Sequence, residues 1–106
     1  ENIFSFVARI IPSNSTEKKF GVRFLDENAN EYTSIIFNMA NKPDYMQLNT
    51  DVNDEYYQSV TNGVAVNMFS ALDFQKFRTR IFKKGTMELV NLESVEMNVK
   101  RKVDFV

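Results

Sequence analysis

KKFGVRFLDENANEYTSIIFN, residues 18–38, decides the fold, because this stretch has the pattern of a β-hairpin. Phe20, Val22 and Phe24 occupy alternate positions, which is the period-2 pattern of a half-buried strand. Residues 26–30 form a polar turn rich in Asp and Asn. The residues that follow favour a second strand, since β-branched and aromatic side chains are frequent there.

The segments on either side of the hairpin supply three further strands. Residues 2–11 are apolar on both faces in places and predict a first strand, which Pro12 ends because it cannot donate to a ladder. Residues 77–90 predict a fourth strand, with a bulge or bend at Gly85. Residues 95–105 alternate and predict a fifth. This order is typical of a five-stranded Greek-key barrel.

Between the third and fourth strands the period changes. Aromatic and apolar residues recur at spacings of three and four, at Tyr45, Leu48, Val52, Tyr56 and Val60. This stripe predicts a helix with Asp44 as its N-cap and Asn62-Gly63 as its stop signal. A second helical piece is predicted at 67–77, although residues 64–66 could equally be extended. The expected fold is therefore mainly β, with a helical insertion over about 43–75.

The composition fits one domain and excludes several kinds of site. The chain has 106 residues and is 43% apolar, which is enough for one packed domain over 1–106. Cysteine and histidine are absent, so Cys/His zinc sites and Ser–His or Cys–His nucleophiles cannot form. The scattered carboxylates and glycines match no metal or phosphate motif. We therefore expect no enzyme, no metal or other cofactor, and no membrane-spanning segment.

A cationic strand is the first candidate binding site. Four basic residues and one aromatic ring alternate there: Lys76, Arg78, Arg80, Phe82 and Lys84. In an extended chain they would share one surface, where cations neutralise phosphates and a ring stacks on a base, as single-stranded nucleic acid requires. The alternatives are a solvated outer face and a helix over 72–84. The net charge of −1 does not exclude a polyanion, since residues 71–106 carry eight basic and five acidic groups.

Two further candidates lie on or beside the hairpin. If the alternate apolar residues of residues 20–24 point inward, Arg23 points outward, and Phe37 is a candidate stacking platform on the same surface. The alternation leaves open whether Phe37 is instead a core residue. In the loop before the hairpin, Lys18 and Lys19 could hold phosphates, although a lysine pair is equally typical of an ordinary solvated loop.

Three stretches resemble the OB-fold domains of the replication protein A large subunit and its telomeric paralogues. Residues 20–38 resemble the second and third strands of that family. Residues 81–91, IFKKGTMELVN, resemble the fourth strand and the loop after it, and residues 95–105 resemble the closing strand. The long segment between strands three and four is most similar to the third OB domain, without its zinc ribbon.

The resemblance implies single-stranded DNA binding. The stacking phenylalanine at the end of the family's third strand falls on Phe37, and the basic residues of its first loop fall on Lys18 and Lys19. Two features depart from the family: a lysine of its fourth strand falls near Glu88, and a second stacking ring has no match around residues 92–94. Nuclear localisation follows from the resemblance alone.

Three functions are distinguished on this basis. The favoured one is a single-stranded DNA-binding OB module in DNA replication or telomere maintenance, with single-stranded DNA or RNA and other subunits or OB domains as partners. The alternative is an OB-type protein–protein adaptor of a larger nucleoprotein complex, using the helical insertion or a barrel edge. A viral or phage structural β-domain without a nucleic-acid role has the least support in the sequence.

Overall fold

A computed structural model describes residues 3–51, 53–73, 81–82 and 85–99, and in this part of the chain the protein is built from β-strands and one short 3-10 helix. The bounds are β1 Ile3–Phe4, β2 Phe6–Pro12, β3 Lys19–Leu25, β4 Glu31–Asn38, β5 Tyr45–Asn49, β6 Tyr56–Thr61, β7 Val64–Asn67, η1 Phe69–Ala71, β8 Ile81–Phe82, β9 Thr86–Val90 and β10 Leu92–Val99. No helix in the described residues is long and apolar enough to cross a membrane.

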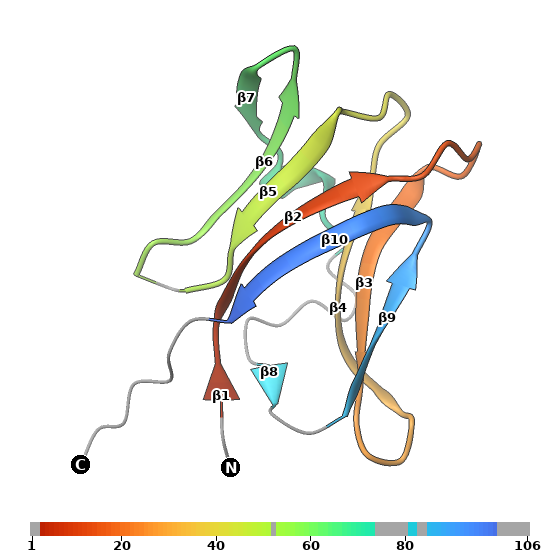
Figure 1. Ribbon diagram of the computed structural model, residues 1–106, viewed down its shortest axis with the longest axis vertical. Helices are drawn as coiled ribbons and strands as arrows, with labels where there is room; N and C mark the ends of the chain where they lie inside the picture. The colour runs from red at the N-terminus through yellow and green to blue at the C-terminus, as the bar shows by residue number, and fades with distance from the viewer. Residues whose placement is uncertain (1–2, 52, 74–80, 83–84, 100–106) are drawn as a thin grey trace.

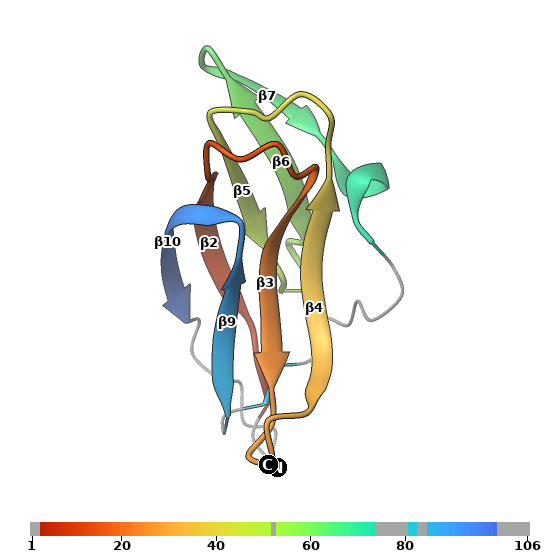
Figure 2. The same ribbon diagram turned by 90° about the vertical axis from the view of Figure 1, so that its right-hand side faces the viewer.

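Two sheets face one another (Figures 1 and 2). One has five strands in the order β10-β2-β5-β6-β7, and the other has three in the order β4-β3-β9. A separate short pair joins β1 to β8. The predicted OB-fold barrel is wrong, because the strands divide between two open sheets that keep their own edges. The sheets face each other as the layers of a β-sandwich do.

The predicted hairpin of residues 18–38 is confirmed as β3 and β4. These strands are antiparallel, with Phe20 opposite Phe37 and Val22 opposite Ile35. Asp26 organises the turn, since its Oδ1 accepts hydrogen bonds from the amides of Asn28 and Asn30, each at 2.9 Å. The turn predicted from the Asp and Asn residues is therefore held by hydrogen bonds from backbone amides to an Asp side chain.

The first and last predicted strands are also present. Strand β2 ends at Pro12, as predicted, and lies between β10 and β5 in the five-stranded sheet. Strand β10 covers the beginning of the predicted fifth strand and pairs antiparallel with β2, with Val99 opposite Phe6. The predicted fourth strand is divided into β8 and β9, and Gly85, with φ +125°, forms a bend immediately before β9. Residues 77–80, 83–84 and 100–105 of these predicted strands lie outside the described residues.

The predicted helical insertion is wrong. Residues 43–73 contain β5, β6 and β7, and η1 is the one helical turn among their described residues. Met46 and Leu48 of β5 point inward, and Tyr57 of β6 is buried beside them, so these alternating residues form the inner face of two strands. Strand β2 pairs with β5, and the hydrogen bonds of this ladder favour a strand over a helix in this segment. The extended alternative for residues 64–66 is confirmed.

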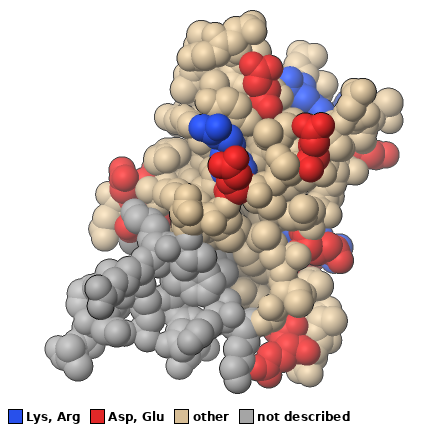
Figure 3. Space-filling model, viewed as in Figure 1, with Lys and Arg blue, Asp and Glu red and all other residues tan. Residues whose placement is uncertain are grey.

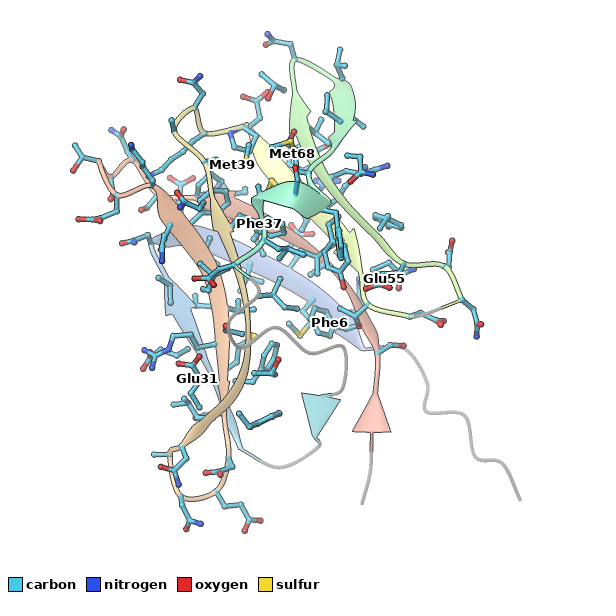
Figure 4. The ribbon with its side chains drawn as sticks, turned by 180° about the vertical axis from the view of Figure 1, so that it is seen from behind. Phe6, Glu31, Phe37, Met39, Glu55 and Met68 are labelled. Atoms are coloured by element: carbon cyan, nitrogen blue, oxygen red, sulfur yellow. The ribbon has the colours of Figure 1, made fainter. Side chains whose placement is uncertain are left out.

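The core lies between the two sheets. Its fully buried aromatic rings come from both layers and include Phe6 of β2, Phe20 of β3 and Phe37 of β4, each 0% exposed. The ring centroids of Phe20 and Phe37 are 5.9 Å apart, as are those of Phe6 and Phe24. Seen from behind, Phe6 and Phe37 point into the space between the layers (Figure 4). Aromatic burial of this kind is a major stabilising contribution to a small domain.

Candidate functional site

One end of the five-stranded sheet carries a surface without charged residues. Residues 56–72 contain no Asp, Glu, Lys or Arg, although 25% of the chain is charged. They form β6, the turn after it, β7 and η1. We call β6 and β7 with their turn the uncharged hairpin; its tip is at the top of Figures 1 and 3. Within the described residues no group of carboxylates is placed to hold a metal ion, so this surface is the better candidate site.

The turn of the uncharged hairpin follows from its sequence. Asn62 and Gly63 have φ of +53° and +80°, as a two-residue type I′ turn requires, and Asn-Gly is the favoured pair for that turn. The backbone amide of Asn62 also donates a 2.9 Å hydrogen bond to the carboxylate of Asp44, which fixes the turn to the start of β5. The hairpin is therefore well defined although it projects from the body of the sheet (Figure 1).

Strand β7 is exposed along its whole length. Val64 is 62% exposed and Val66 is 51% exposed. Val66 lies opposite Ser59, which is buried two residues after the core residue Tyr57. Directly opposed side chains share a face of the sheet. The valines therefore continue the core-facing side of the five-stranded sheet into solvent, beyond the cover of the second layer.

A shallow groove borders the hairpin where β7 passes into η1. Its volume is about 250 Å³, and its lining residues are Glu55, Tyr56, Tyr57, Gln58, Asn67 and Phe69. The Tyr57 hydroxyl donates a 2.7 Å hydrogen bond to Glu55, and burial, followed by that bond and the nearby charge, raises the pKa of Tyr57 well above its ordinary value. The Phe69 ring lies 5.5 Å from the Tyr57 ring and is 42% exposed. The groove thus offers an aromatic wall beside an apolar strand edge.

Phe37 is not a stacking platform. It is 0% exposed and faces Phe20 across the hairpin, so the register that brings Phe20 into the core brings Phe37 there too. Met39 and Met68 pack beside this part of the core (Figure 4). The outward placement of Phe37 was therefore wrong. Ser34 and Ile36, on the opposite face of β4, are buried as well. Because both faces of this strand are buried, its sequence lacks the alternation of apolar and polar residues that would show which face points to the core.

The predicted cations do not form a phosphate-binding surface in the described residues. Arg23 does point outward, but its guanidinium donates to Glu31 at 2.7 Å and also to Glu88. These bonds and charges raise the Arg23 pKa, with Glu31 as the main cause. Lys19 pairs with Asp73 at 3.2 Å, and Lys18 is exposed at the end of the preceding loop. The carboxylates paired with Lys19 and Arg23 neutralise the positive potential that would attract a polyanion.

The remaining predicted site residues are not brought to this surface by anything the structure describes. Lys76, Arg78, Arg80 and Lys84 lie outside the described residues. Phe82 belongs to β8, where its backbone pairs with Ile3, and its side chain is not described. A role for these five residues therefore stays a prediction from the sequence, without a described surface to support it.

Sequence reasoning missed the valines of β7. Two signals could have found them: an Asn-Gly pair flanked by strand-forming residues at 56–61 and 64–67, and the long uncharged run itself. The first signal was missed because the helical spacing of residues 45–60 predicted a helix, and Asn-Gly was then interpreted as the end of that helix. An uncharged edge strand is a candidate interaction surface, since edges that must stay unpaired usually carry charge or proline.

Comparison with known proteins assigns a different family from the one that the sequence suggested. The family model of the C-terminal domain of Dit matches residues 1–106. The distal tail protein of Lactococcus phage p2 is 49% identical over 106 residues, and that of Lactococcus phage SK1 is 47% identical. The chain matches over 100% of its own length and spans 35% of each relative. A chain in a structure of the phage p2 baseplate in its activated conformation with Ca has a TM-score of 0.88.

These findings overturn the resemblance to replication protein A. Single-stranded DNA binding, a role in replication or telomere maintenance, partners in a nucleoprotein complex and nuclear localisation are all wrong, because the similar proteins are phage tail proteins. The expectation that the chain is not an enzyme is confirmed, since the matches are distal tail proteins and a chain of a phage baseplate. Of the three functions, a phage structural β-domain is the one in agreement with the comparisons.

Proposed function

This chain belongs to the family of Dit C-terminal domains, and we propose that it is a structural module that joins neighbouring proteins at the distal end of a phage tail. One observation carries the proposal: 49% identity and a TM-score of 0.88, over the whole of this chain, to part of a protein in the phage p2 baseplate. The chain spans about a third of the length of that protein.

The architecture suits a structural role. Two sheets enclose one core, and the buried side-chain nitrogen and oxygen atoms of the described residues all have hydrogen-bond partners. A satisfied core of this kind favours one rigid shape. The exposed uncharged hairpin then offers apolar side chains and a free strand edge to a neighbouring protein. Protein–protein interfaces bury apolar residues at their centre.

A domain exchange tests the proposal. The matched third of the phage p2 distal tail protein is replaced by residues 1–106, and plaque formation and tail structure by electron microscopy are measured. We expect tails with complete baseplates, because the exchanged domain has the same fold and about half of the same residues. The matched control is the same exchange carrying Phe6→Ala, which opens a cavity in the core and should abolish assembly. Baseplate-free particles from the unmutated exchange, with the exchanged protein folded, would contradict the proposal.

A further inference from the structure

Glu55 is the only charged residue among the described residues that line the groove beside η1. The others carry aromatic rings or side-chain amides: Tyr56, Tyr57, Gln58, Asn67 and Phe69. Glu55 lies immediately before β6, below η1 in Figure 4. A carboxylate beside aromatic rings is a combination that binds an organic cation, because ring faces and carboxylate oxygens attract the same charge.

The Glu55 carboxylate can accept further hydrogen bonds. Its Oε2 accepts the 2.7 Å bond from the Tyr57 hydroxyl. No Lys or Arg that the structure describes forms an ion pair with it. An ionised carboxylate accepts at both oxygens. The bond from Tyr57 therefore holds Glu55 in place and leaves its Oε1 to accept from a ligand.

The charges around the groove favour a cation over an anion. Asp51 and Asp54 belong to the same loop as Glu55. None of the Lys and Arg residues in the described part of the chain lines the groove, and the ion pairs of Lys19 and Arg23 use other carboxylates. Surface charges of one sign raise the local concentration of ligands of the opposite sign. The groove is therefore complementary to positive charge.

Phe69 supplies a ring face that a cation can contact. It is 42% exposed, and its ring centroid lies 5.5 Å from that of Tyr57, with the planes at 45°. The Phe69 amide donates to Asn67 Oδ1 at 2.9 Å, which positions the start of η1 beside the groove. A guanidinium suits this site better than an ammonium, because it is planar, stacks on a ring and donates several hydrogen bonds at once.

We propose that the groove binds an arginine side chain of a neighbouring protein. The guanidinium stacks on Phe69 and donates to the Glu55 carboxylate, while the bond from Tyr57 to Glu55 is kept. The groove volume of about 250 Å³ is below the range of roughly 300–1,000 Å³ for drug-sized ligands, so it suits a single long side chain. This inference rests on the proposed function for the nature of the partner, and it names the chemistry of one contact of the tail module.

Two small compounds test the site on the purified chain. N-acetylarginine amide carries the guanidinium, whereas N-acetylcitrulline amide has nearly the same shape without the charge. The chemical shifts of the Tyr57 and Phe69 rings are followed by NMR at low salt. We expect a dissociation constant of about 10 mM for the arginine compound. The citrulline compound should bind about tenfold more weakly, because it lacks a charge-assisted hydrogen bond.

Three variants assign the binding to the named groups, with circular dichroism reporting the fold of each. Glu55→Gln keeps an acceptor for the Tyr57 hydroxyl but loses the charge, so arginine binding should weaken about tenfold. Phe69→Leu keeps an apolar side chain but loses the ring face, and should weaken binding about threefold. Asp54→Asn is the matched control, because Asp54 carries a charge in the same loop but does not line the groove. It should change the dissociation constant by less than about twofold, since exposed charges are screened.

Three results would overturn the arginine site. The first is equal binding of the arginine and citrulline compounds, which would exclude recognition of the charge. The second is an equal loss in Glu55→Gln and Asp54→Asn, which would show attraction to the loop as a whole. The third is tighter binding of choline than of the arginine compound, which would assign the groove to a quaternary ammonium group.

The two proposals can fail separately. If the phage p2 exchange assembles tails while the arginine compound does not bind, the arginine site is wrong and the tail function stands. If the arginine compound binds through Glu55 and Phe69 but the exchange gives no baseplates, the tail function fails while the arginine site remains.

Discussion

Phe6 and Thr50 exchange two hydrogen bonds beside the end of the β2–β5 ladder. The Phe6 amide donates to Thr50 Oγ1 at 3.0 Å, and the Thr50 amide donates to the Phe6 carbonyl at 3.0 Å. Both residues are almost fully buried, at 0% and 1% exposed. A hydroxyl thus extends the ladder by one step where β5 has already ended at Asn49. Because both residues are buried, each group depends on the other for its partner.

Removing this hydroxyl should destabilise the domain. Thr50→Val keeps the shape of the side chain but leaves the buried Phe6 amide without its acceptor, which costs about 1–3 kcal/mol of unfolding free energy. Thr50→Ser retains the hydroxyl and should cost less. Urea denaturation of both variants against the wild type measures the difference. A smaller loss for Val than for Ser would show that the methyl group, not the hydrogen bond, provides the stability.

Phe37→Ala should destabilise the domain by about 3–5 kcal/mol, because it opens a cavity in a fully packed site. Phe69→Ala provides the comparison, since Phe69 is 42% exposed and its loss should cost only about 1 kcal/mol. Thermal unfolding of the two variants measures the contrast. A Phe37 variant as stable as the Phe69 variant would contradict the burial of Phe37.

Gly21→Ala should destabilise β3 by more than about 2 kcal/mol. A Cβ at Gly21 would lie 2.0 Å from the Ile35 carbonyl oxygen, and the residue has φ +152°. Gly63→Ala is the matched control, because a Cβ there meets nothing within 4 Å although φ is +80°. It should lose only the roughly 1 kcal/mol of an alanine in left-handed backbone. Denaturation midpoints of the two variants in the reverse order would show that β3 moves to accept the methyl group.

Stability should fall above about pH 10 because of Tyr57. Burial raises the pKa of this phenol in the folded chain, so the folded state keeps a proton that the unfolded chain gives up. The stabilisation is complete below the ordinary tyrosine pKa, and roughly 1.4 kcal/mol is lost per pH unit above it. Tyr57→Phe removes this dependence. Urea denaturation of both proteins at pH 8 and pH 11 measures it, and equal pH slopes would exclude Tyr57 as the cause.

Local patterns predicted the hairpin of β3 and β4, the end of β2 at Pro12 and the beginning of β10. In these segments one signal dominates: strict alternation, an Asx-rich turn, or a residue without an amide proton. The bend at Gly85 was equally predictable, because a glycine that interrupts a strand pattern marks a change of direction. Each of these signals is local and needs no knowledge of the partner strand.

The helical stripe and the barrel could not be corrected from the sequence alone. Tyr45, Leu48 and Tyr56 fit a helix face and also fall within strands, and the edge that β2 offers to β5 decides between them. That edge is created by pairing between segments far apart in the chain, which no local period records. The error at Phe37 has the same origin, because its orientation follows from the register with Phe20 and not from its own neighbours.

Asn91 is the single residue between β9 and β10, and it connects the two layers of the sandwich. Its carbonyl accepts a 2.8 Å hydrogen bond from the Ser13 amide, and its side-chain amide donates to the Lys19 carbonyl at 2.8 Å. Four strand ends, from β2, β3, β9 and β10, therefore meet at one residue. A pulling force that reaches this corner is divided among them, so the layers deflect together as a single stiff beam rather than sliding past one another.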